Sequence, residues 1–183
     1  MPRFENARAL LALKKPELAM AAAMLATQID AENAEAFHVV GRARIVQEQW
    51  AQAIVALKQA VLLNPQHGWA HNNLGFAYLR TNQNDKAATV LERAVALLPN
   101  SGKTFNTLGV ALERSGRFES AREAYSRASE LSPHYVKAQL NADRLAQLDV
   151  DQHPMLDETQ PSIDSSIDAF DVMRSDRIDP SLE

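Results

Sequence analysis

The side chains that could carry out covalent chemistry are few and scattered in this sequence. The 183 residues include no cysteine, which excludes thiol catalysis, disulfides and thiolate metal sites. The serines fall mostly in predicted turns or near the C-terminus, and none stands with a histidine in a recognisable nucleophile motif. We therefore predict that the protein is not an enzyme and has no catalytic or cofactor-binding residues.

One short pattern resembles part of a phosphate-binding loop. Gly102-Lys103-Thr104 matches the end of such a loop, but Leu97 stands where the earlier glycine is required. The same residues begin a predicted helix, so a structural role explains them.

The histidines provide the other candidate ligands. His67 and His71 are four residues apart, but His67 lies in a predicted turn and no carboxylate partner is evident. The remaining histidines are scattered, so we predict no metal site. They are His38, His134 and His153.

The elements that position these residues follow from a repeat of 34 residues. Within residues 68–101 the apolar spacing predicts two helices joined by a polar turn, Asn82-Gln83-Asn84-Asp85, and Pro99 ends the unit. Glycine and alanine let helices approach closely, and stacked units cover each other's apolar faces. The residues that recur in this register include Gly41, Gly75 and Gly109; Ala53, Ala87 and Ala121; Leu57, Leu91 and Tyr125; and Pro65, Pro99 and Pro133.

This pattern resembles that of tetratricopeptide-repeat proteins, over about residues 1–148. Leu74-Gly75, Tyr78, Ala87 and Pro99 stand at the family's characteristic positions. The resemblance implies an all-α fold, a right-handed α-solenoid of antiparallel helix pairs. The expected units are a degenerate first repeat at 1–33, repeats at 34–67, 68–101 and 102–135, a capping helix at 136–148 and an acidic flexible tail at 149–183.

The two ends of the array depart from the pattern. In residues 1–33 we expect helices at 7–13 and 18–29, forming either a capping repeat or half of a longer one. In residues 136–148 we expect Val136, Leu140 and Leu145 to cover the last repeat, with Asp143 and Arg144 facing water.

The resemblance also implies where a ligand binds, because the first helix of each repeat lines the concave groove in this family. Amides there can hold a peptide backbone, and arginine and lysine can hold carboxylates, so the expected ligand is an acidic peptide or a free C-terminus. The alternative is a solvated face without a ligand. The expected groove residues are His38, Arg42, Trp69, Asn72, Asn73, Phe76, Arg80, Lys103, Asn106, Val110 and Arg114.

Two groove types known in the family match only in part. Co-chaperone domains grip a terminal carboxylate with five side chains, of which only Asn73 and Lys103 have counterparts here. The segment His71-Asn72-Asn73-Leu74-Gly75 resembles asparagine-lined repeats of glycosyltransferases, but no transferase domain follows. Neither match identifies the ligand.

The charge is divided unevenly along the chain. Residues 1–148 carry 17 basic and 13 acidic side chains, a net charge of +4, whereas residues 149–183 carry 2 and 10, a net charge of −8. Within the tail, residues 162–173 place Ile163, Ile167 and Phe170 at helical spacing. This segment either folds on a partner or on the protein's own groove, or it is part of a disordered tail.

These observations favour a non-catalytic adaptor or scaffold that binds a protein or peptide partner. The alternative is a regulatory module in a signalling or enzyme complex, whose acidic tail binds a partner or docks on the protein's own groove. The alanine-rich repeats resemble those of bacterial pilus or secretion-assembly proteins. The basic charge is too sparse for nucleic-acid binding, and no apolar run suits a membrane span. The N-terminus lacks a signal-peptide pattern, so we expect a cytoplasmic protein, or a periplasmic one if a leader has been trimmed.

Overall fold

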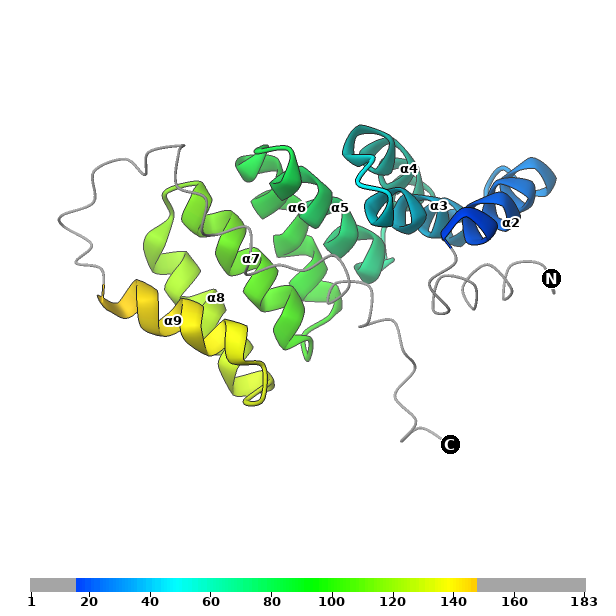
Figure 1. Ribbon diagram of the computed structural model, residues 1–183. Helices are drawn as coiled ribbons and strands as arrows, with labels where there is room; N and C mark the ends of the chain where they lie inside the picture. The colour runs from blue at the N-terminus through cyan, green and yellow to red at the C-terminus, as the bar shows by residue number, and fades with distance from the viewer. Residues whose placement is uncertain (1–15, 148–183) are drawn as a thin grey trace, which may run out of the picture.

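The computed structural model describes residues 16–147, and within this range the regular structure is helical throughout (Figure 1). Consecutive helices pack as antiparallel pairs, which confirms the expected all-α solenoid. The predicted helix at 7–13 and the acidic tail, with its segment 162–173, lie outside the described residues. The helices are α2 (Pro16–Ile29), α3 (Ala34–Val46), α4 (Trp50–Leu63), α5 (Gly68–Arg80), α6 (Asn84–Leu97), α7 (Gly102–Arg114), α8 (Phe118–Leu131) and α9 (Val136–Gln147).

Close helix packing within each repeat explains the recurring glycines. A Cβ atom added to Gly75 on α5 would lie 2.3 Å from Cγ of Leu91 on α6, which is closer than two non-bonded carbon atoms can approach. Gly41 and Gly109 stand equally close to Leu57 and Tyr125 in their own repeats. The glycines therefore bring the paired helices together, and each large partner fills the space that a side chain would occupy.

The turns inside the repeats share a left-handed residue, which the periodicity did not reveal. Glu48, Asn82 and Gly116 have φ values of 57°, 56° and 74°, at positions 34 residues apart. After each one the chain closes the helix end with a backbone bond, as where Gln83 N–H donates to the Tyr78 carbonyl at 2.9 Å. The turn is shorter than predicted, because α6 already begins at Asn84.

Equivalent side chains cap the first helix of each repeat. Asn33, His67 and Ser101 accept hydrogen bonds from the backbone N–H groups of Ala36, Ala70 and Thr104, at 2.9, 3.3 and 3.3 Å. Each satisfies a donor that the first helical turn leaves free. These three residues occupy the same position in the repeat. A residue type that caps the helix in one repeat is therefore expected to cap it in another.

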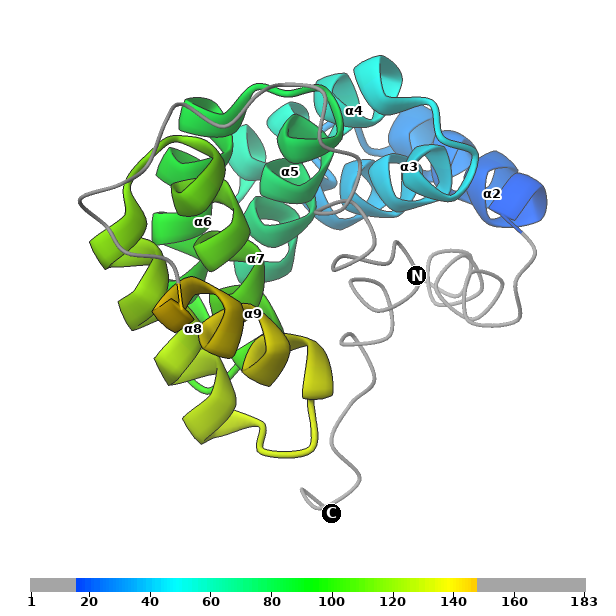
Figure 2. The same ribbon diagram turned by 60° about the vertical axis from the view of Figure 1, so that its left-hand side comes forward.

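The helices form two layers (Figure 2). Neighbouring odd-numbered helices α3, α5, α7 and α9 contact each other more than neighbouring even-numbered helices do. The stack therefore curves with the odd-numbered helices on its inner side. We call the surface that they form the inner face.

The last helix, α9, packs differently from the prediction. Val136 and Leu140 are 64% and 61% exposed, so the expectation that they cover the last repeat is wrong, whereas Leu145 is buried as expected. Arg144 was expected to face water but forms an ion pair with Glu113, with 2.6 Å between Nη1 and Oε1. The spacing of apolar residues in α9 did not show which side of the helix packs against α7 and α8, the side with Val136 and Leu140 or the side with Leu145.

The repeat register explains how α9 closes the regular array. Asp143 stands 34 residues after Gly109, where the earlier repeats have the glycine that admits a second helix. The aspartate is exposed, so the side of α9 that would take an equivalent of α8 is uncovered within the described residues. None of the helices in residues 16–147 has the length and apolar content needed to cross a bilayer.

Candidate functional site

The structure places the eleven predicted groove residues at two depths on α3, α5 and α7. Partly exposed side chains are those of Trp69, Arg80, Lys103 and Arg114. Buried ones are those of His38, Arg42, Asn72, Asn73, Phe76, Asn106 and Val110. Phe76 and Val110 belong to the hydrophobic core, and the Phe76 ring packs edge-on against Trp50 at 5.9 Å. Only some of the predicted set is therefore available for a first contact with a ligand.

Contacts between neighbouring first helices account for the burial of Phe76 and Val110. Glu113 on α7 pairs with Arg144 on α9, 31 residues later. The same separation relates Ile45 to Phe76 and Leu79 to Val110, and all four belong to the hydrophobic core. This register position is an inter-repeat contact, so its apolar members are needed to hold the stack together.

A second inter-repeat register carries polar side chains along the inner face. Asn73 Nδ2 lies 2.9 Å from His38 Nε2, and Asn141 Nδ2 donates to Asn106 Oδ1 at 3.0 Å, both across 35 residues. Asn72 and Thr107 have the same separation, but Thr107 donates instead to the carbonyl of Lys103 at 2.9 Å. The polar row is thus interrupted between α5 and α7.

The interruption leaves buried polar atoms without hydrogen-bond partners. Among the described residues these include Asn72 Oδ1, Asn73 Oδ1 and Asn106 Nδ2. Asn72 is 3% exposed, and Asn73 and Asn106 are fully buried. A buried polar group without a partner is costly, and most such groups in native proteins are satisfied. These amides are therefore the feature of the inner face that most needs an explanation.

Positive side chains flank these amides. The Arg80 guanidinium lies over the Trp50 ring, 4.9 Å from its centroid, and Arg114 Nη1 donates to the Leu79 carbonyl at 3.3 Å. Lys103 is partly exposed at the first turn of α7. Helices α5 and α7 therefore carry cationic groups near their ends and amides between them.

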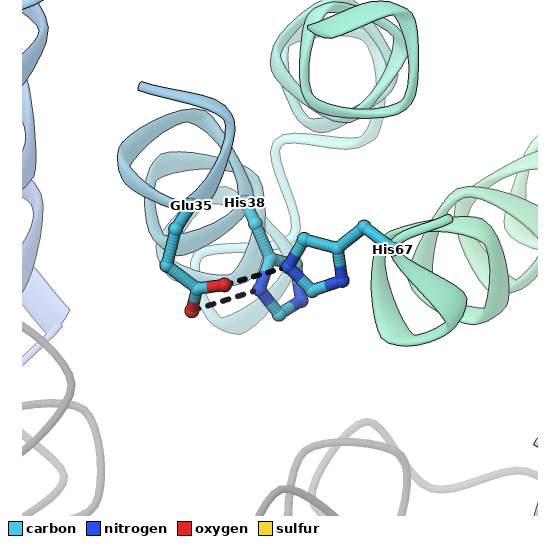
Figure 3. A group of neighbouring side chains, drawn as sticks. All are labelled: Glu35, His38 and His67. Atoms are coloured by element: carbon cyan, nitrogen blue, oxygen red, sulfur yellow. Dashed lines mark hydrogen bonds and ion pairs between the residues drawn. The ribbon is translucent and has the colours of Figure 1, made fainter. Parts of the chain in front are cut away.

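A compact polar cluster lies at the junction of α3 and α5 (Figure 3). Glu35 Oε2 is 2.7 Å from His67 Nε2, and Glu35 Oε1 is 3.5 Å from His38 Nδ1. The two imidazole rings meet edge-on with their centroids 4.4 Å apart. We call these three residues the Glu35–histidine cluster, and one candidate ligand atom from each residue lies within 4.8 Å of the other two.

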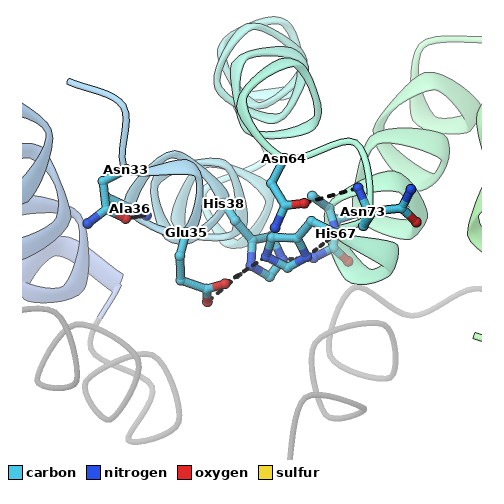
Figure 4. A network of polar contacts seen from close by, with 9 residues as sticks. Asn33, Glu35, Ala36, His38, Asn64, His67 and Asn73 are labelled. Carbon is cyan, nitrogen blue, oxygen red and sulfur yellow. Dashed lines mark hydrogen bonds and ion pairs between the residues drawn. The ribbon is translucent and has the colours of Figure 1, made fainter. Parts of the chain in front are cut away.

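Hydrogen bonds around the cluster indicate where the imidazole protons lie (Figure 4). His67 Nδ1 accepts from Ala70 N–H, so a neutral His67 carries its proton on Nε2, facing Glu35. With Asn73 Nδ2 donating to His38 Nε2, the His38 proton is on Nδ1, which also faces Glu35. Burial opposes ionisation of Glu35, but the hydrogen bonds from both histidines and their electrostatic attraction outweigh it and hold the pKa of Glu35 well below its usual range.

The expectation that His67 has no carboxylate partner is wrong. Its partner, Glu35, lies 32 residues earlier in the chain, whereas His71 lies outside the cluster and contacts the Pro65 carbonyl at 3.2 Å. A search near His67 in sequence could not find Glu35. The repeat register could have, because the start of one first helix lies beside the start of the next.

Comparison with known proteins agrees with this architecture. Residues 45–108 match one family model and residues 102–135 match another, and both are described as tetratricopeptide repeats. The chain belongs to the tetratricopeptide-repeat family. No curated protein sequence matches it.

Solved structures with the same fold cover from about two thirds to almost the whole of the chain. YrrB, described as a TPR protein with an unusual peptide-binding site, has a TM-score of 0.72 and 21% identity, over 97% of this chain and 87% of its own. MamA from Desulfovibrio magneticus RS-1 has a TM-score of 0.72 and 22% identity, over 96% of both chains. The first TPR domain of Spaghetti (RPAP3), bound to the HSP90 peptide SRMEEVD, has a TM-score of 0.61 and 24% identity, over 64% of this chain and 94% of its own.

Proposed function

We propose that this protein is a non-catalytic adaptor whose inner face binds an extended, acidic segment of a partner protein. The observation that carries the proposal is the group of buried amides on α5 and α7, at Asn72, Asn73 and Asn106, each of which has one amide atom without a partner. An extended peptide has free N–H and C=O groups at regular intervals, which are the partners that these amides need. Asn72, which is 3% exposed, would be the first of these groups that a bound peptide reaches; Asn73 and Asn106 are fully buried, so a peptide would satisfy them only if their side chains turn outward on binding.

The preference for acidic segments rests on the flanking charges. Arg80, Lys103 and Arg114 are partly exposed around the amides, and hydrogen bonds from such cations to carboxylates are stronger than neutral ones. The peptide bound by the Spaghetti (RPAP3) domain contains Glu-Glu-Val-Asp, so this fold can hold an acidic segment. A role in a bacterial assembly or secretion complex would fit the alanine-rich composition.

Replacing Asn72 with alanine tests the proposal, because it separates binding from stability. Asn72 Oδ1 has no partner to lose, so we expect the free energy of unfolding to change by less than about 1 kcal/mol. Peptide affinity should fall about 5- to 150-fold, as expected when a buried polar group loses a partner at a cost of about 1–3 kcal/mol. Fluorescence anisotropy with labelled acidic, amidated acidic and basic peptides measures the affinity, and urea unfolding followed by circular dichroism measures the stability.

Charge reversal provides the second arm of the same experiment. Arg80→Glu should abolish binding of the acidic peptides, whereas Lys58→Glu, an equal charge change at an exposed site on α4, should preserve it. Asn100→Ala, in the exposed turn before α7, is the matched amide control. The proposal is rejected if no peptide in the panel binds, or if Asn72→Ala and Arg80→Glu both bind like wild type.

The alternative is a regulatory module in which the acidic tail occupies the inner face. The opposite charges of residues 1–148 and 149–183 favour it. Deleting residues 150–183 should then raise the affinity for an external acidic peptide, and a synthetic peptide of residues 162–173 should compete with it. Unchanged affinity after the deletion, measured by the same anisotropy titration, would leave the adaptor proposal standing and remove this alternative.

A further inference from the structure

We propose that the Glu35–histidine cluster binds one divalent transition-metal ion, with Zn²⁺ as the best fit, and that the ion links two adjacent repeats. Glu35 and His38 are one turn apart on α3, and His67 caps α5 in the next repeat (Figure 3). The proposal does not depend on peptide binding, because its three ligands are not among the amides proposed to hold the peptide, although Asn73 contacts His38.

The donor set suits zinc in type and number. Two imidazoles and one carboxylate make three protein ligands, and zinc sites of this kind keep a fourth position for water or another group. Nitrogen and oxygen donors of this mixture favour zinc, cobalt, nickel or copper over magnesium or calcium, which prefer oxygen ligands alone.

The distances suit zinc as well. Donor atoms around a tetrahedral zinc ion lie about 3.3 Å apart when zinc–ligand distances are about 2.0–2.1 Å. Here the carboxylate oxygens lie 2.7 and 3.5 Å from the imidazole nitrogens that face them, and no pair in the cluster exceeds 4.8 Å. Small side-chain rotations would therefore equalise the distances. Glu35 is 30% exposed, which leaves a route for the ion from solvent.

The protons that face Glu35 mark the place of the ion. His38 Nδ1 and His67 Nε2 each direct an N–H group toward the Glu35 carboxylate. A divalent cation would replace these two protons, so that both nitrogens and the carboxylate point at one positive charge. The ligands must be deprotonated, so metal affinity should fall as the pH is lowered.

The surroundings can support the metal-bound form. His38 would then carry its proton on Nε2, where Asn73 stands at 2.9 Å. The Asn73 amide can turn to present Oδ1, which has no other partner, and such an outer hydrogen bond orients a histidine ligand. His67 would give up only its 3.3 Å bond from Ala70 N–H.

The test uses the full chain without a polyhistidine tag. Titration with Co²⁺, followed by visible absorption, should show one bound equivalent with the intensity of a tetrahedral site, and Zn²⁺ should displace it. Zn²⁺ should also raise the melting temperature, because an ion that binds only the folded state stabilises it. No binding by the wild type at millimolar Co²⁺ or Zn²⁺ would overturn the proposal.

His67→Asn is the decisive variant because it removes a ligand while keeping the helix cap. Asparagine at the equivalent position, Asn33, already caps α3. We expect the variant to remain folded without metal, with a lower melting temperature because Glu35 loses its 2.7 Å contact with His67, and to bind Co²⁺ at least about tenfold more weakly. Glu35→Gln should also weaken binding.

Two other histidines supply the controls. His71→Asn and His134→Asn alter histidines outside the cluster and should bind Co²⁺ like the wild type. Wild-type affinity in His67→Asn, or loss of binding in either control instead, would place the ion elsewhere and overturn the proposal. The melting curves without metal show whether each variant is folded.

Discussion

Replacing Leu91 with alanine is expected to lower the free energy of unfolding by about 2–5 kcal/mol. Leu91 is fully buried and fills the space beside Gly75, where α5 and α6 meet in the central repeat. Truncation removes apolar contacts and leaves a cavity between two helices that neighbouring repeats hold in place. Urea unfolding followed by circular dichroism measures the change.

The close contact with Gly75 makes this prediction more specific. In the wild type a methyl group at Gly75 would overlap Leu91, which should lower the free energy of unfolding by about 1–3 kcal/mol. The higher helix propensity of alanine offsets about 1 kcal/mol of this loss. In the double variant Gly75→Ala with Leu91→Ala, the new methyl group occupies part of the vacated space. The double variant should therefore be less destabilised than the sum of the two single variants.

An exposed leucine provides the matched control. Leu62 on α4 is 72% exposed, so Leu62→Ala should change the free energy of unfolding by no more than about 0.5 kcal/mol. Equal losses for Leu91→Ala and Leu62→Ala would contradict the packing of α5 against α6. Strict additivity of the Gly75 and Leu91 substitutions would contradict their contact.

The second large effect is expected for Arg144→Met, with a loss of about 3 kcal/mol. The Glu113 carboxylate is 1% exposed and accepts hydrogen bonds from Tyr125 Oη at 2.8 Å and from Arg144 Nη2 at 2.7 Å. Removing Arg144 leaves this carboxylate buried without its cation. The Arg144 side chain is 41% exposed, so water can partly replace it, which places the effect at the low end for a buried pair.

The loss should be localised at the C-terminal end of the array. Arg144 lies on α9, so amide hydrogen exchange should accelerate in α9 and α8 more than in α3 and α4. A surface pair supplies the control, because Arg127 and Glu130 are both about half exposed, and Arg127→Met should cost less than about 1 kcal/mol. Uniform acceleration across the chain would contradict a local role.

Replacing both Glu113 and Arg144 with apolar residues separates what the ion pair contributes to stability from the destabilisation caused by removing only one partner. Glu113→Leu with Arg144→Val copies Leu79 and Val110, which have the same 31-residue relation one repeat earlier. Adding Tyr125→Phe removes the hydroxyl that would otherwise lose its acceptor. This triple variant should recover most of the stability lost in Arg144→Met. Failure to recover would mean that the ion pair itself holds α9 in place.

The repeat spacing predicted the helix pairs correctly because local requirements recur in each unit. Gly75 and Leu91 are required by close helix packing within one repeat, and Pro99 ends the repeat. Their positions in the sequence therefore indicate where the helices lie. The left-handed residues Glu48 and Asn82 were not predicted, since neither is a glycine and only Gly116 marks that turn position by type.

The candidate sites were harder to predict because they depend on contacts between repeats. Phe76 and Val110 were expected on the groove, but the structure buries them where successive first helices touch. Val136 and Leu140 were expected to cover the last repeat, but the structure buries Ala138, Asn141 and Leu145 instead. The pairing of Glu35 with His67 was not expected either.

The sequence by itself determined the repeat family, the helix pairs and the chemical character of the inner helices, because these follow from residue types at a fixed spacing. Only the tertiary structure decided which of the inner side chains are buried and which face solvent. It also decided that Glu35, His38 and His67 meet, and that Asn72, Asn73 and Asn106 each have one buried amide atom without a partner. The physical reason is that one helix has several possible faces, and the angle at which the next repeat stacks selects among them.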